Sequence, residues 1–296
     1  VKTPNLDALA NQSVHFTHAL AGCPVCTPSR ATLLTGQRPL THGLFVNDVP
    51  LEPKGKSIAE IFVDSGYDTA YIGKWHINGK GRSSYIPPHR RLGFQYWKVL
   101  ECTHDYNKSA YYAGDSEEKR YWDGYDAMAQ TRDAEAYIRN HDKNRPFFMM
   151  LSWGPPHAPY DTAPEEFKKL YNPTTLELRP NVPDTISAKA KEWLAGYYAH
   201  CSALDECVGQ LLTTIRECEI EKETIFVFTS DHGDMLGSQG QIKKQRPWDE
   251  SIRIPFLLRY PGLPNWKPGK TDALIDVLDF MPTLLVPVSY PHLTLP

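Results

Sequence analysis

A helical segment followed by a short apolar segment recurs three times along this chain, and this order constrains the fold more than any other feature. The spacing of apolar residues predicts helices over 57–65, 123–141 and 187–219. Each is followed by a predicted strand, at 67–73, 146–153 and 224–230. A last strand at 254–259 and a helix at 276–285 complete the series. The alternation predicts one α/β domain with a mostly parallel sheet sandwiched by helices.

Composition excludes several classes of protein. A mean hydropathy of -0.46 with 23% charged residues is typical of a globular chain, and no stretch approaches the roughly 20 apolar residues of a membrane-spanning helix. The 32 basic and 35 acidic residues give a net charge of -3, which argues against nucleic acid as a partner. Six cysteines in 296 residues are too few for a disulfide scaffold. Because basic and acidic residues nearly balance, any bound anion must be held by a local cluster of side chains.

Three regions lack this regular pattern. Residues 79–120 show neither helical nor strand periodicity clearly, so we expect a long functional loop or an insertion there. The chain opens directly on a helix capped by Thr3, with no strand before it. Residues 286–296 contain three prolines and resemble a truncation or read-through artefact. We therefore expect one partial domain over 1–285 and an irregular tail over 286–296.

The segment 24–36 predicts an anion site at the start of a helix. Thr27 is a good N-cap, Pro28 suits the first helical position and Gly36 suits the stop. Cys26 then lies at the helix mouth, where free N–H groups favour a sulfate or phosphate ester, and Arg30 adds a charge one turn inside. Two alternatives stay open: a buried inert cysteine, or a metal or redox pair with Cys23, although no second C-x-x-C accompanies it.

Polar clusters follow three of the predicted strands, at 73–76, 154–157 and 230–234. The carboxyl ends of parallel strands converge, so we expect one shared site. Asp231 is a hard ligand suited to Ca²⁺ or Mg²⁺. The cations or proton donors for an anionic ester are Lys74, His76 and His157, with a further basic cluster at 243–248. Taken singly, each is a weak signal, because a lone histidine is usually structural and a lysine is usually solvated.

These motifs resemble the type I sulfatases of the alkaline phosphatase-like superfamily. Cys-Thr-Pro-Ser-Arg at 26–30, continuing to Leu-Leu-Thr-Gly at 33–36, is similar to the first family signature. The segment 66–76, Gly-Tyr-Asp-Thr-Ala-Tyr-Ile-Gly-Lys-Trp-His, is similar to the second. Pro-Pro-His at 155–157 and Ser-Asp-His-Gly-Asp at 230–234 extend a resemblance that runs from Val1 to about Leu285.

The resemblance implies a modified nucleophile. A formylglycine-generating enzyme, directed by Cys26, Pro28 and Arg30, would oxidise Cys26 to formylglycine, and the hydrated aldehyde would attack sulfur. The other implied roles are Arg30 holding the formylglycine, Lys74 and Lys244 binding sulfate, His157 protonating the leaving oxygen, and His76 assisting proton removal from the hydrate. Lys244 is preferred to Lys243 because it stands four residues before Trp248. Calcium would be the cofactor, with Asp231, His232 and Cys26 as metal ligands.

The sequence departs from the family pattern at both ends. Family members begin with a strand that ends in paired aspartates, the first half of the calcium site, whereas this sequence starts after that point. Asp7 does not replace them because it lies in the following helix. We therefore expect the first strand and the C-terminal subdomain of the family to be absent from this chain. Calcium prefers six or more oxygen ligands, so binding and turnover by these residues alone are open questions.

The resulting prediction is a sulfatase that hydrolyses sulfate esters, with a carbohydrate sulfate favoured over an aryl sulfate. The rival functions are a phosphate or phosphonate monoester hydrolase of the same superfamily and an inactive fragment that binds sulfated glycans. Residues 79–120 are either a specificity region or a plain surface loop; the residues of interest there are His89, Arg90, Arg91, His104 and Tyr106. We expect no membrane span, and export to the periplasm, the exterior or the lysosome.

Overall fold

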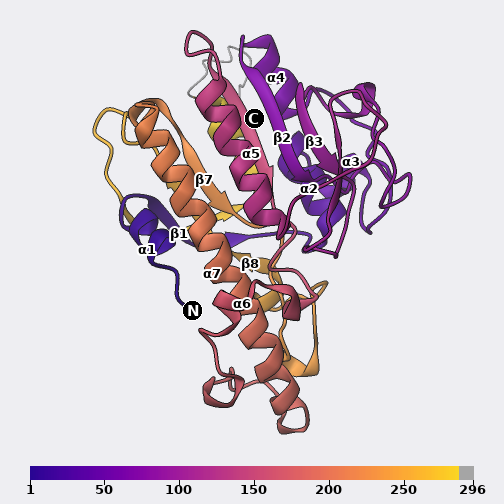
Figure 1. Ribbon diagram of the computed structural model, residues 1–296, viewed down its shortest axis with the longest axis vertical. Helices are drawn as coiled ribbons and strands as arrows, with labels where there is room; N and C mark the ends of the chain where they lie inside the picture. Colours follow the sequence, from indigo (N-terminus) through magenta and orange to yellow (C-terminus); the bar gives the residue numbers. More distant parts are fainter. Residues whose placement is uncertain (287–296) are drawn as a thin grey trace.

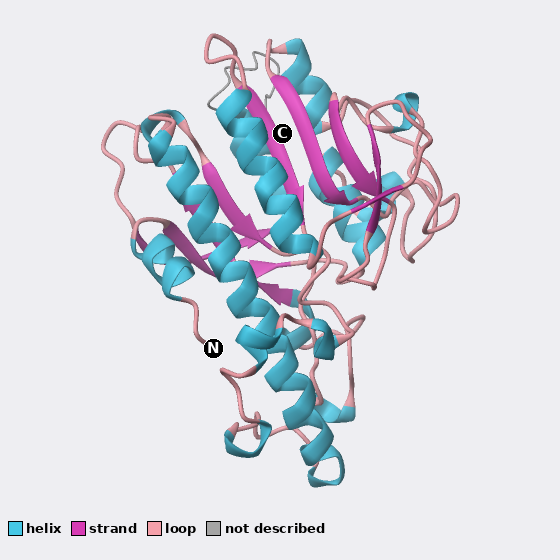
Figure 2. Cartoon of the chain, in the orientation of Figure 1, coloured by secondary structure: helices cyan, strands magenta, loops and turns pink. Residues whose placement is uncertain are grey.

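The computed structural model describes residues 1–286 and confirms an α/β fold (Figures 1 and 2). Its strands form two sheets of five, one with the order β5-β4-β3-β2-β6 and one with the order β10-β1-β9-β7, in which β8 also pairs with β1. The strands are β1 Val14–Leu20, β2 Asp68–Lys74, β3 Tyr96–Leu100, β4 Ala110–Ala113, β5 Arg120–Tyr121, β6 Phe147–Ser152, β7 Phe226–Thr229, β8 Arg253–Ile254, β9 Phe256–Arg259 and β10 Gly269–Asp276.

The longest ladders are parallel. β2 pairs in parallel with β3 and β6, and β1 pairs in parallel with β10, over five or six residues each. The antiparallel ladders extend over only two to four residue pairs. In the β2–β6 ladder Gly73 lies opposite Ser152. Lys74 and the residues after Ser152 therefore leave the sheet at the same edge, as the strand-end argument requires.

Helices cover both faces of the strands. α5 Asp126–Asn140 and α7 Ser187–Glu217 cross one face (Figure 1), while α2 Cys26–Thr35, α4 Ile58–Asp64 and α9 Phe280–Leu285 pack on the other. Alternation along β2 separates the two cores: Tyr71 packs with α2 and α4, and Ile72 packs with α5 and α7. α4 begins at a capping box, in which Ser57 Oγ accepts from Glu60 N and Ser57 N donates to Glu60 Oε2.

The remaining elements are short. They are α1 Pro4–Asn11, α3 Pro39–His42, α6 Glu165–Lys168, α8 Asp249–Ile252, and the 3₁₀ turns η1 Pro88–Arg90, η2 Tyr160–Thr162, η3 Pro173–Thr175, η4 Asp184–Ile186, η5 Glu221–Glu223, η6 Ser238–Gly240 and η7 Val277–Asp279. None of the helices in residues 1–286 is both long and apolar enough to cross a membrane. The tail predicted over 286–296 lies, from residue 287 onward, outside the described residues.

Several expectations are corrected by the structure. Residues 79–120 are not one long loop, because β3, β4 and the first residue of β5 lie there. β1 and β10 were not expected: each mixes polar and apolar residues, and their pairing with each other makes them strands. The signature helix begins at Cys26 with Val25 as N-cap, not at Pro28 with Thr27 as N-cap, while Gly36 ends it in the left-handed conformation as expected.

The edges of β6 and β7 are not joined. Within residues 1–286 no backbone pairing connects these two strands, although both carry nearly continuous apolar residues. A cavity of about 1360 Å³ is lined by both strands and extends to Arg30, Asp231 and His157. The β6 edge of one sheet and the β7 edge of the other therefore line a shared cavity, and polar groups that follow these strands line it as well.

We predict that Gly73→Ala lowers the free energy of unfolding by at least about 2 kcal/mol. A Cβ at Gly73 would lie 2.2 Å from Ser152 O, and the φ of 105° is unfavourable for alanine. Gly66→Ala is the matched control, because it has a φ of 86° but nothing within 4 Å of the new Cβ. Urea unfolding of both variants measures the difference, and equal losses would show that backbone conformation alone is responsible.

Candidate functional site

The first turn of α2 is attached to two loops. Thr27 N donates to Asn47 Oδ1 at 3.0 Å, and Thr27 Oγ1 donates to His76 O at 2.6 Å. The Thr27 N–H is already bonded to Asn47, and Pro28 has no N–H group. This turn therefore offers an anion fewer backbone donors than the sequence predicts. The helix start thus positions Cys26, and attraction for an anion must come mainly from side-chain charges.

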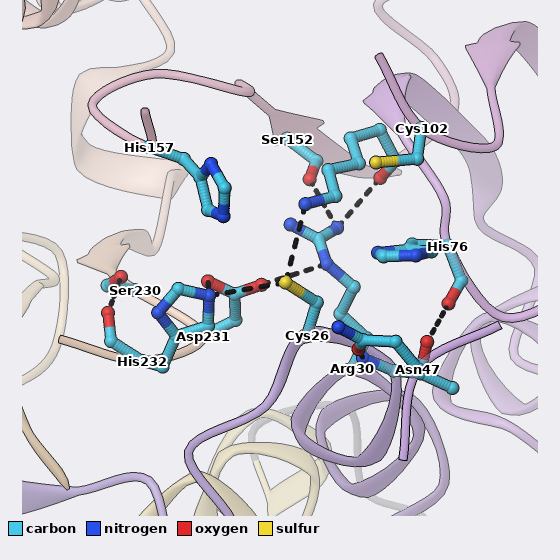
Figure 3. A network of polar contacts seen from close by, with 12 residues as sticks. Cys26, Arg30, Asn47, His76, Cys102, Ser152, His157, Ser230, Asp231 and His232 are labelled. Carbon is cyan, nitrogen blue, oxygen red and sulfur yellow. Dashed lines mark hydrogen bonds and ion pairs between the residues drawn. The ribbon is translucent and has the colours of Figure 1, made fainter. Parts of the chain in front are cut away.

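Cys26 is 2% exposed and lies among cationic groups (Figure 3). Its Sγ is 3.2 Å from His232 Nε2 and 3.5 Å from Lys74 Nζ. Burial by itself would raise the pKa of the thiol, but the charge of Lys74 and hydrogen bonds with His232 and His76 hold it well below its ordinary value. The pocket therefore stabilises negative charge at the tip of residue 26.

Arg30 connects the helix to three strand ends. Its Nε donates to Asp231 Oδ2 at 2.9 Å, and its Nη1 donates to Lys74 O and to Ser152 Oγ, both at 2.7 Å. Burial would raise the pKa of Asp231, but the charges of His232 and Arg30 lower it far below its usual range. The Arg30–Asp231 pair is therefore ionised in the buried site.

His76 faces the pocket from the loop after β2. Its backbone has a φ of 62°, which is uncommon for a residue other than glycine. Its Nε2 lies 3.0 Å from Asp48 Oδ1, and Asp48 also accepts two bonds from Arg82. Burial would lower the pKa of His76, but hydrogen bonds with Cys102 and Cys26 raise it to about 9. With both thiols in place, His76 is therefore protonated at neutral pH.

His157 faces the pocket from the other side (Figure 3). Its Nδ1 lies 2.8 Å from Ala158 O, and its Nε2 lies 2.6 Å from Lys244 Nζ. Because a carbonyl accepts and an ammonium donates, the compatible tautomer carries its proton on Nδ1. Burial and the charges of Lys244 and Lys74 lower the pKa of His157 to about 3. Without a bound anion the imidazole is therefore neutral.

Three groups could share a metal ion. One ligand atom each from Cys26, Asp231 and His232 lies within 4.8 Å of the others. This donor set is one thiol, one carboxylate and one imidazole, whereas calcium takes six to eight oxygen ligands. Among residues 1–286 this group alone does not fit calcium, even when an oxygen replaces the sulfur at residue 26.

The structure brings all the sequence-predicted site residues together. Hydrogen bonds and charge interactions link them into one network, which comprises Cys26, Arg30, Lys74, His76, His157, Asp231, His232 and Lys244. Cys23 is outside the possible metal group, and the six cysteines are free thiols. Within the possible specificity region Arg90 and Arg91 bind neighbouring loop atoms. By contrast, His104 stacks on His157.

Sequence reasoning missed several supporting residues. Ser152 carried a usable signal, since it is the polar end of an apolar strand. Asn47 and Asp48 carried none, because they lie in an irregular loop that only tertiary packing brings to α2 and His76. The sequence pattern assigns no role to Cys102. In the structure, hydrogen bonds with His104 and His76 outweigh the effect of burial and lower the pKa of its thiol to about 5.

Comparison with known proteins identifies the family of this chain. The family model Sulfatase matches residues 1–286. An ulvan-active sulfatase from Formosa agariphila is 48% identical over 288 residues, which cover 96% of this chain and 56% of that protein. An endo-4-O-sulfatase from Bacteroides thetaiotaomicron is 32% identical, over 96% of this chain and 62% of its own length. The chain belongs to the sulfatase family and spans somewhat more than half the length of these relatives.

Solved structures confirm the fold. A protein described as the sulfatase YidJ from Bacteroides fragilis superposes with a TM-score of 0.92 at 29% identity, over 98% of this chain and 69% of that one. A phosphonate monoester hydrolase from Agrobacterium radiobacter superposes with a TM-score of 0.79 at 22% identity, over 98% and 69%. The latter likeness shows the fold alone.

We predict that His157 makes stability depend on pH. Its pKa is about 3 in the folded chain and near 6.5 when unfolded, so between these values only the unfolded chain binds the proton. Acidification from pH 7.5 to pH 5 should therefore cost the natural protein about 1 to 2 kcal/mol more than the His157→Gln variant. Urea unfolding at both pH values measures this difference, and parallel losses would contradict the prediction.

Proposed function

We propose that the protein carrying this sequence is a sulfatase that hydrolyses carbohydrate sulfate esters through a formylglycine made from Cys26. One observation carries the proposal: a buried Cys26 at a helix start, enclosed by Lys74, His232, His76 and Arg30, with His157 and Lys244 beside them. The sulfatase relatives named above support the reaction class, and the names of the ulvan-active and endo-4-O enzymes support a carbohydrate substrate.

The thiol of Cys26 stands in for the oxygens of a hydrated aldehyde. When formylglycine is formed, one of its geminal hydroxyls supplies the nucleophile that attacks sulfur and expels the alcohol. Lys74 and His232 already lie at donor distance from Sγ, so an oxygen there would accept their hydrogen bonds. Lys74 and Lys244 would neutralise the sulfate oxygens as charge develops in the transition state.

Two histidines on opposite sides would move the protons. His157 is neutral beside Lys244, and the negative charge of a bound sulfate ester would offset that repulsion and raise its pKa. It could then protonate the leaving oxygen. His76 is charged partly because it bonds to the Cys26 thiol, so oxidation of that thiol would lower its pKa. A neutral His76 could take the proton whose loss releases sulfate.

Calcium, maturation and location belong to the same proposal. Calcium would be held by Asp231, His232 and residue 26. Further oxygen ligands would be required, because these three groups supply fewer than the six to eight oxygens that calcium takes. A formylglycine-generating enzyme would act on Cys26 before folding buries it. We propose that the protein is exported. The structure adds only that none of the helices in residues 1–286 could span a membrane.

We predict that Cys26 is oxidised when the protein is produced with a formylglycine-generating enzyme. The tryptic peptide ending at Arg30 should then carry an aldehyde in place of the thiol, as measured by its mass and by reaction with a hydrazide. A known sulfatase converted in the same cells is the control. An unmodified thiol beside a converted control would favour the inactive glycan-binding alternative.

We predict faster cleavage of an aryl sulfate than of the matched aryl phosphate. The comparison is informative because the superfamily also includes enzymes that hydrolyse phosphorus esters. Faster phosphate cleavage would replace the proposal with a phosphate or phosphonate monoester hydrolase.

We predict that Lys244→Met lowers kcat/KM for the sulfate by about tenfold or more, the loss expected when one cation is removed from developing negative charge. Lys243→Met is the matched control, since Lys243 is exposed whereas Lys244 Nζ contacts His157.

A further inference from the structure

His104 covers one face of His157. The two imidazole rings are parallel within 6°, with centroids 4.8 Å apart, which is an offset stack. His104 belongs to the segment 101–106 that follows β3, and His157 belongs to the segment 154–158 that follows β6. The stack therefore connects two loops that leave neighbouring parts of one sheet.

The segment 101–106 is held firmly enough to act as a support. Glu101 Oε1 accepts from Asn78 N at 2.7 Å and Gly79 N at 2.8 Å, which attaches the segment to the loop after His76. Cys102 Sγ lies 4.0 Å from His104 Nε2 and contacts the edge of that ring. Glu101 and Cys102 are both buried. His104 is thus presented by an anchored backbone.

A second contact joins the same two segments. Tyr106 OH donates to Ala158 O at 3.4 Å, and this carbonyl also lies 2.8 Å from His157 Nδ1. A Cβ at Gly154 would lie 2.7 Å from Tyr106 Cε1, so the close approach of the two segments requires glycine there. The Ala158 carbonyl, which selects the tautomer of His157, is therefore held by Tyr106, a residue of the same segment that carries His104.

The hydrogen bonds of His157 do not by themselves fix the plane of its ring. One runs to a backbone carbonyl and the other to Lys244, which has a flexible side chain. The other groups facing the ring are His232, which meets it edge-on with centroids 6.1 Å apart, and the charges of Lys74 and Cys26. Among the contacts within residues 1–286 named here, the stack with His104 is the one that lies flat on the imidazole and resists tilting of its plane.

We propose that His104 is a positioning residue for His157: by stacking on the ring it holds Nε2 toward Lys244 and the pocket. This inference rests on the proposed function, in which His157 protonates the leaving oxygen. His104 acts through His157 and does not itself contact the reacting atoms. Its planar ring, rather than its nitrogens, is the property that the position requires.

Three variants test the proposal on two sulfate esters. His104→Leu removes the flat ring, His104→Phe keeps it without nitrogens, and His18→Leu is the control at an exposed histidine of β1. An alkyl ester of a sulfated monosaccharide needs protonation of its leaving oxygen, whereas 4-nitrophenyl sulfate needs little. We expect His104→Leu to lower kcat for the sugar ester about tenfold or more, with KM and the aryl ester changed less than about twofold. His104→Phe should restore most of the loss.

Equal losses on both esters, or failure of the phenylalanine variant to recover, would overturn the positioning role. If the natural protein hydrolyses neither ester, the proposed function is wrong. The positioning role of His104 is then tested by a measurement that needs no turnover. The ¹⁵N shifts of the His157 ring should report the Nδ1–H tautomer in the natural protein and a mixture in His104→Leu. An unchanged tautomer in that variant would also overturn the inference.

Discussion

The largely buried ion pair between Arg30 and Asp231, whose side chains are 11% and 19% exposed, is the interaction on which the arrangement of the site depends. The two sheets are not joined at β6 and β7 within the described residues, and Arg30 contacts the ends of β2, β6 and β7 at once. Removing one partner of such a pair leaves an uncompensated buried charge, which typically costs about 3–5 kcal/mol. The pair therefore fixes how the start of α2, and with it Cys26, lies relative to the strand ends.

The charges around that pair explain the chemistry of the pocket. Lys74 and protonated His76 face the tip of residue 26, and the low pKa values of Cys26 and Cys102 show that they create a strongly positive environment. A preorganised set of cations of this kind stabilises an anion without rearranging when charge develops. The backbone donors at the helix start contribute less, because Asn47 occupies one and Pro28 lacks another. An anionic group would thus be met by side chains from several elements rather than by one helix.

The two histidines differ because their neighbours differ. His76 lies beside thiols and Asp48, which favour its charged form, whereas His157 is buried beside two lysines, which favour its neutral form. These resting protonation states are the reverse of the proposed roles, so the proposed mechanism requires His157 to gain a proton when the anion binds and His76 to lose one when the Cys26 thiol is replaced. The segment that carries Cys102, His104 and Tyr106 contributes to both sides, since Cys102 helps to raise the pKa of His76 and His104 stacks on His157.

The sequence by itself determined the local elements and the main groups of the site. Apolar periodicity located α4, α5, α7, β2, β6 and β7 to within a few residues, and the signature motifs singled out Cys26, Arg30, Lys74 and His157, because these signals are carried by residues close together in the chain. Only the tertiary structure decided that β1 and β10 are strands, that Asn47 and Asp48 support the site, and that His104 stacks on His157. Each of these depends on a partner far away in sequence, whose position is fixed only when the whole core packs.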